Sequence, residues 1–193
     1  MNDTIQAFLV STGVVALAEI CDKTQLLALV LAAKYRKPLP IILGILVATL
    51  LNHALAGFVG AWLAATIGPD LMRWILGVSF IAMAAWTLVP DQYEDEAQKP
   101  PRWGVFATTL LAFFVVEIGD KTQIATVALA AKYTSLFAVV AGTTLGMMIA
   151  NVPAVLLGEV AARKLPMRLV HGIAAAIFLV LGVLVLLGVG NLG

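Results

Sequence analysis

The chain has 193 residues, of which 62% are hydrophobic and 12% are charged, and its mean hydropathy is +1.02. Soluble domains usually carry about 25% charged and about 45–50% apolar residues, so this composition excludes an ordinary soluble domain and indicates a membrane protein. A net charge of +1 offers no basic surface for nucleic acid, and a single cysteine, Cys21, excludes an internal disulfide.

Apolar runs separated by charged or proline-containing breaks predict six membrane spans. About 20 apolar residues are needed to cross the hydrocarbon core of a bilayer. The predicted spans are Thr4–Ala33, Leu39–Ile67, Leu71–Val89, Trp103–Ala131, Ser135–Ala162 and Met167–Leu187. We therefore expect an all-α membrane protein with six transmembrane helices.

The first and fourth predicted spans, Thr4–Ala33 and Trp103–Ala131, are longer than a bilayer requires. About 30 residues make about 45 Å of straight helix, whereas the hydrocarbon core is about 30 Å thick. We expect each of these two segments to be strongly tilted, kinked or broken.

Two related motifs lie near the centres of these long segments. They read E-I-C-D-K-T-Q at Glu19–Gln25 and E-I-G-D-K-T-Q at Glu117–Gln123, and they are 98 residues apart. The same offset relates Gly44 to Gly142. Ionised side chains are costly inside a membrane and usually mark a functional pathway, so a repeated acidic motif indicates a duplicated working part.

The repetition divides the chain into two predicted three-span repeats, residues 1–90 and 103–193, joined by an acidic linker at residues 91–102. Three is an odd number of spans, so the second repeat must enter the membrane from the opposite face. Such inverted-topology repeats are common in secondary transporters, whose sites lie near the bilayer midplane where the repeats meet.

Basic residues in the loops predict the orientation. The loops between spans 1 and 2, 3 and 4, and 5 and 6 carry eight of them: Lys34, Arg36, Lys37, Lys99, Arg102, Arg163, Lys164 and Arg168. The opposite side has only Arg73 and Lys132. The positive-inside rule places the basic loops in the cytoplasm and both termini outside it.

The acids and amides of the two motifs form the candidate metal site. Residues three apart share a face of a helix, so we expect each motif to present two carboxylates and one amide on a single stripe. The predicted ligands are Glu19, Asp22, Gln25, Glu117, Asp120 and Gln123. Oxygen donors of this kind suit Ca²⁺, Mg²⁺ and Mn²⁺.

Charge balance suggests what such a site exchanges. Four carboxylates with Lys23 and Lys121 carry a net charge of minus two, which one divalent cation or two protons would neutralise. Carboxylates that lie close together also favour proton uptake. The competing interpretation is that each aspartate and its neighbouring lysine form a structural ion pair, or that the lysines extend toward the interface.

Seven further residues are possible accessory members of the site: Lys23, Lys121, Thr24, Thr122, Asn52, His53 and Asn151. The threonines alternatively hydrogen-bond their own helices, and the asparagines alternatively join neighbouring helices. His53 is a candidate proton relay or a packing residue.

The paired E-x-G-D-K-T-Q motifs in a chain of six predicted spans resemble the small cation/proton antiporter family known as uncharacterised protein family 0016. That family includes Golgi Ca²⁺/Mn²⁺ transporters of eukaryotes and manganese exporters of bacteria. The resemblance covers essentially the whole chain and implies proton-coupled export of Mn²⁺ or Ca²⁺, with Glu19, Asp22, Glu117 and Asp120 as the site. Cys21 departs from the family glycine, which Gly119 keeps, and is interpreted as a small packing residue or an additional soft ligand.

We therefore predict a transporter of the bacterial inner membrane that exports Mn²⁺, with Ca²⁺ as the rival cargo. Its expected partners are the divalent ion, protons and the lipid bilayer, and no cofactor beyond the transported ion is expected. A cation channel is the alternative within the membrane class, with the acids forming a selectivity ring. A membrane enzyme is disfavoured because the two histidines have no metal-ligand spacing.

Overall fold

The structure is a computed structural model that describes residues 2–20, 22–88, 104–157 and 167–188. Every element within these ranges is a helix. In chain order the helices are α1 (Asp3–Glu19), α2 (Lys23–Tyr35), α3 (Pro38–Thr66), α4 (Pro69–Thr87), α5 (Gly104–Glu117), α6 (Lys121–Lys132), α7 (Leu136–Leu157) and α9 (Met167–Leu186). The predicted linker at 91–102 lies outside the described residues.

Both of the long predicted segments are broken, as their length suggested. α1 ends at Glu19 and α2 begins at Lys23, and the two helices differ in direction by 70°. In the second half α5 ends at Glu117 and α6 begins at Lys121, at the corresponding positions of the repeat. The breaks therefore fall inside the acidic motifs themselves.

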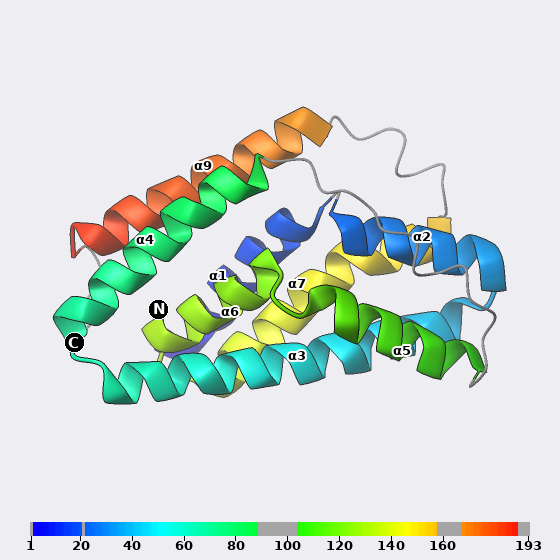
Figure 1. The fold of residues 1–193 in the computed structure, drawn as a ribbon, viewed down its shortest axis with the longest axis horizontal. Helices are drawn as coiled ribbons and strands as arrows, with labels where there is room; N and C mark the ends of the chain where they lie inside the picture. The colour runs from blue at the N-terminus through cyan, green and yellow to red at the C-terminus, as the bar shows by residue number, and fades with distance from the viewer. Residues whose placement is uncertain (1, 21, 89–103, 158–166, 189–193) are drawn as a thin grey trace.

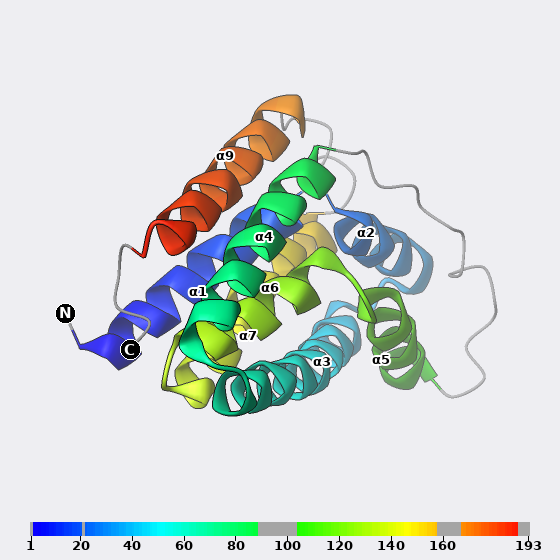
Figure 2. The same ribbon diagram turned by 60° about the vertical axis from the view of Figure 1, so that its left-hand side comes forward.

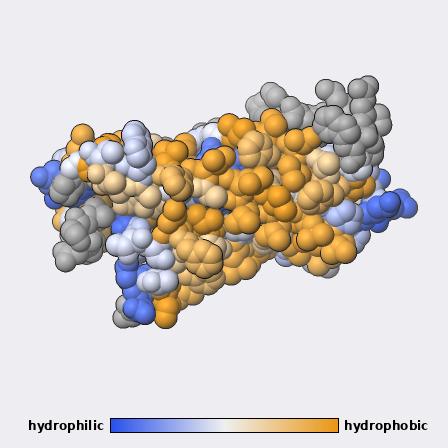
Figure 3. Space-filling model, turned by 90° about the horizontal axis from the view of Figure 1, so that it is seen from below, coloured by the Kyte–Doolittle hydropathy of each residue, from blue (hydrophilic) through white to orange (hydrophobic). Residues whose placement is uncertain are grey.

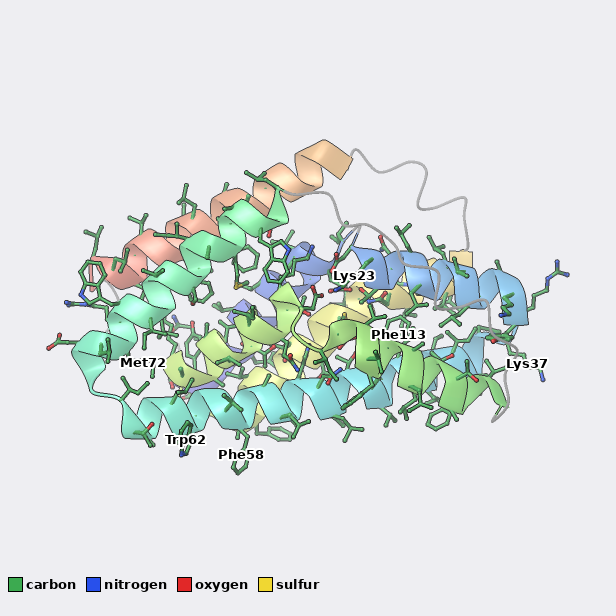
Figure 4. All side chains as sticks on the ribbon, viewed as in Figure 1. Lys23, Lys37, Phe58, Trp62, Met72 and Phe113 are labelled. Atoms are coloured by element: carbon green, nitrogen blue, oxygen red, sulfur yellow. The ribbon has the colours of Figure 1, made fainter. Side chains whose placement is uncertain are left out.

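The outer surface suits a membrane. Among the described helices, α3 and α7 are each long and apolar enough to cross a bilayer, and α1 with α2 makes a third span if the bent pair is counted as one. Apolar side chains cover the middle of the molecule in Figure 3, and hydrophilic residues lie at its two ends. On α3, Phe58 and Trp62 expose 71% and 61% of their surfaces and point away from the bundle (Figure 4).

The helices form a group around the two breaks, with a separate pair beside it. α4 and α9 lie side by side in Figures 1 and 2 and pack extensively on each other. The unbroken helix α3 packs against α5 and α6, whereas the unbroken helix α7 packs against α1 and α2. Each half of the chain thus supplies a straight helix that crosses the broken helices of the other half.

Glycines allow these crossings to be close. A Cβ atom at Gly44 on α3 would lie 2.9 Å from the carbonyl oxygen of Phe106 on α5. A Cβ atom at Gly142 on α7 would lie 2.5 Å from the carbonyl oxygen of Phe8 on α1. Phe8 and Phe106 are 98 residues apart, as Gly44 and Gly142 are, so one contact is repeated with the two halves exchanged.

Basic residues of the connection between α2 and α3 lie at one end of the long axis, and the start of the chain lies at the other (Figures 1 and 4). The connection from α2 to α3, which carries Arg36 and Lys37, lies at one end (Figure 4). The start of α1, the connection from α3 to α4 and the end of α9 lie at the other (Figure 1). There the Thr134 hydroxyl donates to Asp3 Oδ2 at 2.8 Å, which ties the start of α1 to the connection between α6 and α7.

We predict that Gly142→Val destabilises the protein by about 1–3 kcal/mol, because the added atoms meet backbone that cannot move aside. The measurement is thermal unfolding of the purified protein in detergent, followed by tryptophan fluorescence. Gly13→Val on α1 is the matched control, since a Cβ there has no atom within 4 Å. Equal unfolding temperatures for the two variants would contradict the close crossing of α7 and α1.

Candidate cation site

The two helix breaks place the four acids of the motifs. Glu19 is the last residue of α1, and Asp22 immediately precedes α2. Glu117 is the last residue of α5, and Asp120 immediately precedes α6. All four side chains are buried.

The expectation that each motif presents one continuous helical stripe is wrong. Asp22 has φ −83° and ψ 169°, and Asp120 has φ −77° and ψ 164°, which are extended rather than helical values. Each glutamate therefore belongs to one helix, and its aspartate precedes the next. The acids converge because the chain turns between them, and of the three expected ways to fit a long segment into the bilayer (tilt, kink or break) the structure shows the break.

Gly119 makes the second break possible. Its φ is +77°, in the left-handed region that glycine adopts readily and residues with a Cβ rarely do. Its N–H donates to Gln123 Oε1 at 2.7 Å, so the amide oxygen proposed as a ligand already accepts a backbone hydrogen bond. The corresponding position in the first motif is Cys21, which lies outside the described residues.

Three carboxylates come together at the centre of the molecule. Oxygens of Glu19, Asp22 and Asp120 lie within 4.8 Å of one another, which is a spacing that one cation could bridge. Two of these acids come from the first motif and one from the second. Glu117 stands outside this group, and its Oε1 accepts a hydrogen bond from the Thr49 hydroxyl at 3.3 Å.

The two lysines of the motifs pair with aspartates of the opposite repeat. Lys121 Nζ lies 2.8 Å from Asp22 Oδ1, and Lys23 Nζ lies 3.4 Å from Asp120 Oδ1. Neither lysine is paired with the aspartate that precedes it in its own motif among these ion pairs. The two contacts are the same contact with the halves of the chain exchanged.

The helix ends distribute the negative charge unevenly. The N-terminal end of a helix favours a negative side chain, and the C-terminal end disfavours it. Asp22 and Asp120 lie at N-terminal ends and each has a lysine, whereas Glu19 and Glu117 lie at C-terminal ends. The two glutamates therefore have the greater need for a bound cation or proton.

The side-chain amides of Gln25, Asn52 and Asn151 lie near the two helix breaks. Gln25 Nε2 donates to the Ala150 carbonyl on α7 at 2.9 Å. Asn52 Nδ2 donates to the Phe114 carbonyl at 3.1 Å, and Asn151 Nδ2 donates to the Met147 carbonyl at 3.1 Å. Their donors are engaged, but the Oδ1 atoms of both asparagines are buried with no hydrogen-bond partner among the described residues.

The remaining accessory candidates are also buried. The hydroxyls of Thr24 and Thr122 and both ring nitrogens of His53 have no hydrogen-bond partner within the part of the chain that the structure describes. Thr49 was not expected from the sequence, although it lies on α3 one turn before Asn52 and His53. Polar residues three and four apart share one face of a helix, so this spacing on an otherwise apolar helix could have indicated Thr49 as part of the site.

A buried acidic centre between crossed apolar helices is typical of the class of membrane ion transporters. The sequence profile described as divalent cation/proton antiporter GDT1 matches residues 7–95 and 105–191. The two matched segments begin 98 residues apart, as the motifs do. The chain therefore belongs to the GDT1 divalent cation/proton antiporter family, whose members are transporters rather than enzymes.

Two relatives cover most of the chain. A Vibrio cholerae serotype O1 protein named "Putative manganese exporter" is 51% identical over 173 residues, which are 89% of this chain and 86% of that protein. The GDT1-like protein sll0615 of Synechocystis is 28% identical over 207 residues, covering 90% of this chain and 93% of its own length. No solved structure matches the chain.

We predict that Gly119→Val costs about 1–2 kcal/mol of stability, because a β-branched residue is strained at positive φ, and that Gly119→Asn costs less. No atom lies within 4 Å of a Cβ built at Gly119, so crowding is not the cause. Gly68→Val is the control, since Gly68 is equally uncrowded but has φ −61°. The measurement is thermal unfolding of the purified variants. An unfolding temperature for Gly119→Asn no higher than that for Gly119→Val would argue against the left-handed turn.

Proposed function

We propose that this protein exports divalent cations from the cytoplasm in exchange for protons, with Mn²⁺ as the preferred cargo. The observation that carries the proposal is the charge pattern at the breaks. Each aspartate is paired with a lysine of the other repeat, and two buried glutamates remain without a basic partner among the described ion pairs.

The uncompensated charge of minus two fits exchange. One divalent cation neutralises two glutamates, and so do two protons, so either occupant produces a neutral centre. Leaving the centre empty and charged in an apolar interior is costly, which favours the two loaded states over the empty one. Because Glu19 serves both occupants, cation binding and proton binding exclude each other at that carboxylate.

The proposed topology is six spans in two inverted repeats. Its support is the exchange of contacts between the halves: Gly44 with Phe106 and Gly142 with Phe8, and the two lysine–aspartate pairs. Proteins built in this way move cargo by rocking one repeat against the other around a central site. In the proposed orientation, which the basic loops favour, the end with Lys37 faces the cytoplasm of a bacterial cell and both termini lie outside it.

The proposed ligands are the carboxylates of Glu19, Asp22 and Asp120, with Glu117 and the amides of Gln25 and Gln123 contributing in other states of the cycle. The buried Oδ1 atoms of Asn52 on α3 and Asn151 on α7 are available as accessory metal ligands. Such oxygen ligands bind Ca²⁺ as well as Mn²⁺, so Ca²⁺/H⁺ exchange is the second candidate. The name of the Vibrio cholerae relative favours manganese.

The test is flux through purified protein in proteoliposomes, with Mn²⁺ and Ca²⁺ offered separately, with and without an imposed pH gradient. We expect Mn²⁺ flux to rise when protons are driven in the opposite direction. Glu19→Gln and Asp120→Asn should each lower the flux at least about tenfold, because each removes a ligand carboxylate.

Asp70→Asn is the matched control, since Asp70 lies at the start of α4 with its side chain 93% exposed. Full flux in both site variants would refute the site, whereas flux indifferent to the pH gradient would refute exchange and favour a channel. Faster Ca²⁺ flux than Mn²⁺ flux at equal concentrations would reverse the assigned cargo.

A further inference from the structure

The two lysine–aspartate pairs occupy equivalent positions of the repeat but differ in geometry. The Lys121–Asp22 pair is short, at 2.8 Å, and the Lys121 side chain is only 1% exposed. The Lys23–Asp120 pair is longer, at 3.4 Å, and the Lys23 side chain is 25% exposed. The first pair is sealed within the protein, and the second is partly open.

The open pair involves a carboxylate that a cation needs. Asp120 belongs to the three carboxylates whose oxygens lie within 4.8 Å of one another, and Lys23 binds its Oδ1. A divalent cation and an ammonium group cannot both bind the Asp120 carboxylate closely, because two positive charges a few ångströms apart repel each other strongly in a low-dielectric interior. One of them must leave when the other binds.

The two lysines are not equally able to leave. An ammonium group can depart only to water or to another carboxylate, because exposure to hydrocarbon is costly. The Lys23 side chain is 25% exposed, and its long flexible stem can carry the ammonium away from Asp120. Lys121 is enclosed, and its departure would leave Asp22 charged and buried.

We propose that Lys23 is an exchangeable counter-ion, which occupies Asp120 in the empty site and is displaced by the cargo cation, whereas Lys121 is a fixed positioning residue for Asp22. The assignment rests on the proposed cation transport and deepens it. Charge also balances within the group of three carboxylates, because Glu19, Asp22 and Asp120 with Lys121 carry minus two, which one divalent cation neutralises once Lys23 has left. Glu117 lies outside this group and is neutral when it holds a proton.

The direct test is amine labelling of the full-length protein in detergent. The protein, freed of metal with a chelator, is treated with an acetylating reagent with and without saturating Mn²⁺, and acetylation of each lysine is measured by mass spectrometry. Labelling of Lys23 should rise severalfold with Mn²⁺, while labelling of Lys121 stays low. The exposed residue Lys37 is the internal control, because its labelling should not change.

Mn²⁺ binding is measured in the same samples by equilibrium dialysis, which separates the two ways of failing. Bound Mn²⁺ with unchanged or reduced labelling of Lys23 would overturn the counter-ion assignment and leave the proposed function standing. An equal rise at Lys121 would overturn the division of roles. No bound Mn²⁺ would overturn both proposals.

Transport kinetics supply a second test in which the matched variants move in opposite directions. Lys23→Gln removes the competitor and should lower the KM for Mn²⁺ roughly two- to fivefold, the range for loss of a partly exposed ion pair. Lys121→Gln should raise the KM at least about tenfold, because Asp22 loses the group that orients it. Lys23→Arg should restore the wild-type KM, since it keeps the charge. Shifts of both glutamine variants in the same direction would refute the proposal.

Discussion

The exchanged lysine–aspartate pairs are the interaction on which the rest of the structure depends. Burying carboxylates in an apolar helical protein is costly unless each finds a positive partner. Here the partner of Asp22 is Lys121 and that of Asp120 is Lys23, so each repeat holds the countercharge of the other. Neither half is electrostatically complete alone, and the two breaks must meet at one place for both pairs to form.

Much of this arrangement follows from the sequence, because its cause is local or repeated. The two long segments were expected to be strongly tilted, kinked or broken, and the structure shows them broken after Glu19 and Glu117. The acids were expected to lie close together, but the shared stripe was wrong, because E-x-x-D has the spacing of a helical face whether or not the helix continues. The choice of lysine partner is a tertiary contact between residues about 98 apart, and the one-letter pattern alone does not fix it.

The two halves carry different neighbours around their glutamates. Thr49 on α3 and Met147 on α7 correspond to each other at the 98-residue offset. The Thr49 hydroxyl donates to Glu117, whereas a methionine sulfur has no proton to donate, and Met147 instead accepts from Asn151 Nδ2 at 3.2 Å. Within the described residues the Glu19 carboxylate has no hydrogen-bond donor. Glu19 therefore depends more than Glu117 on a proton or a cation, and it is the glutamate grouped with the two aspartates.

The unbroken helices explain how such breaks survive inside a membrane. Non-helical backbone at this depth needs hydrogen-bond partners from the protein, because hydrocarbon offers its N–H and C=O groups none. The exposed Gly119 N–H, for example, donates to Gln123 Oε1. α3 crosses the second break, where the Thr49 hydroxyl donates to Glu117 and Asn52 Nδ2 donates to the Phe114 carbonyl. α7 crosses the first break, where Gln25 Nε2 donates to the Ala150 carbonyl. Glycines at the crossings bring these helices near enough to do so. Close packing and buried charge thus support each other: the straight helices cover the acids at the breaks, although Ile118 and Gly119 stay exposed, and without the breaks the acids could not converge.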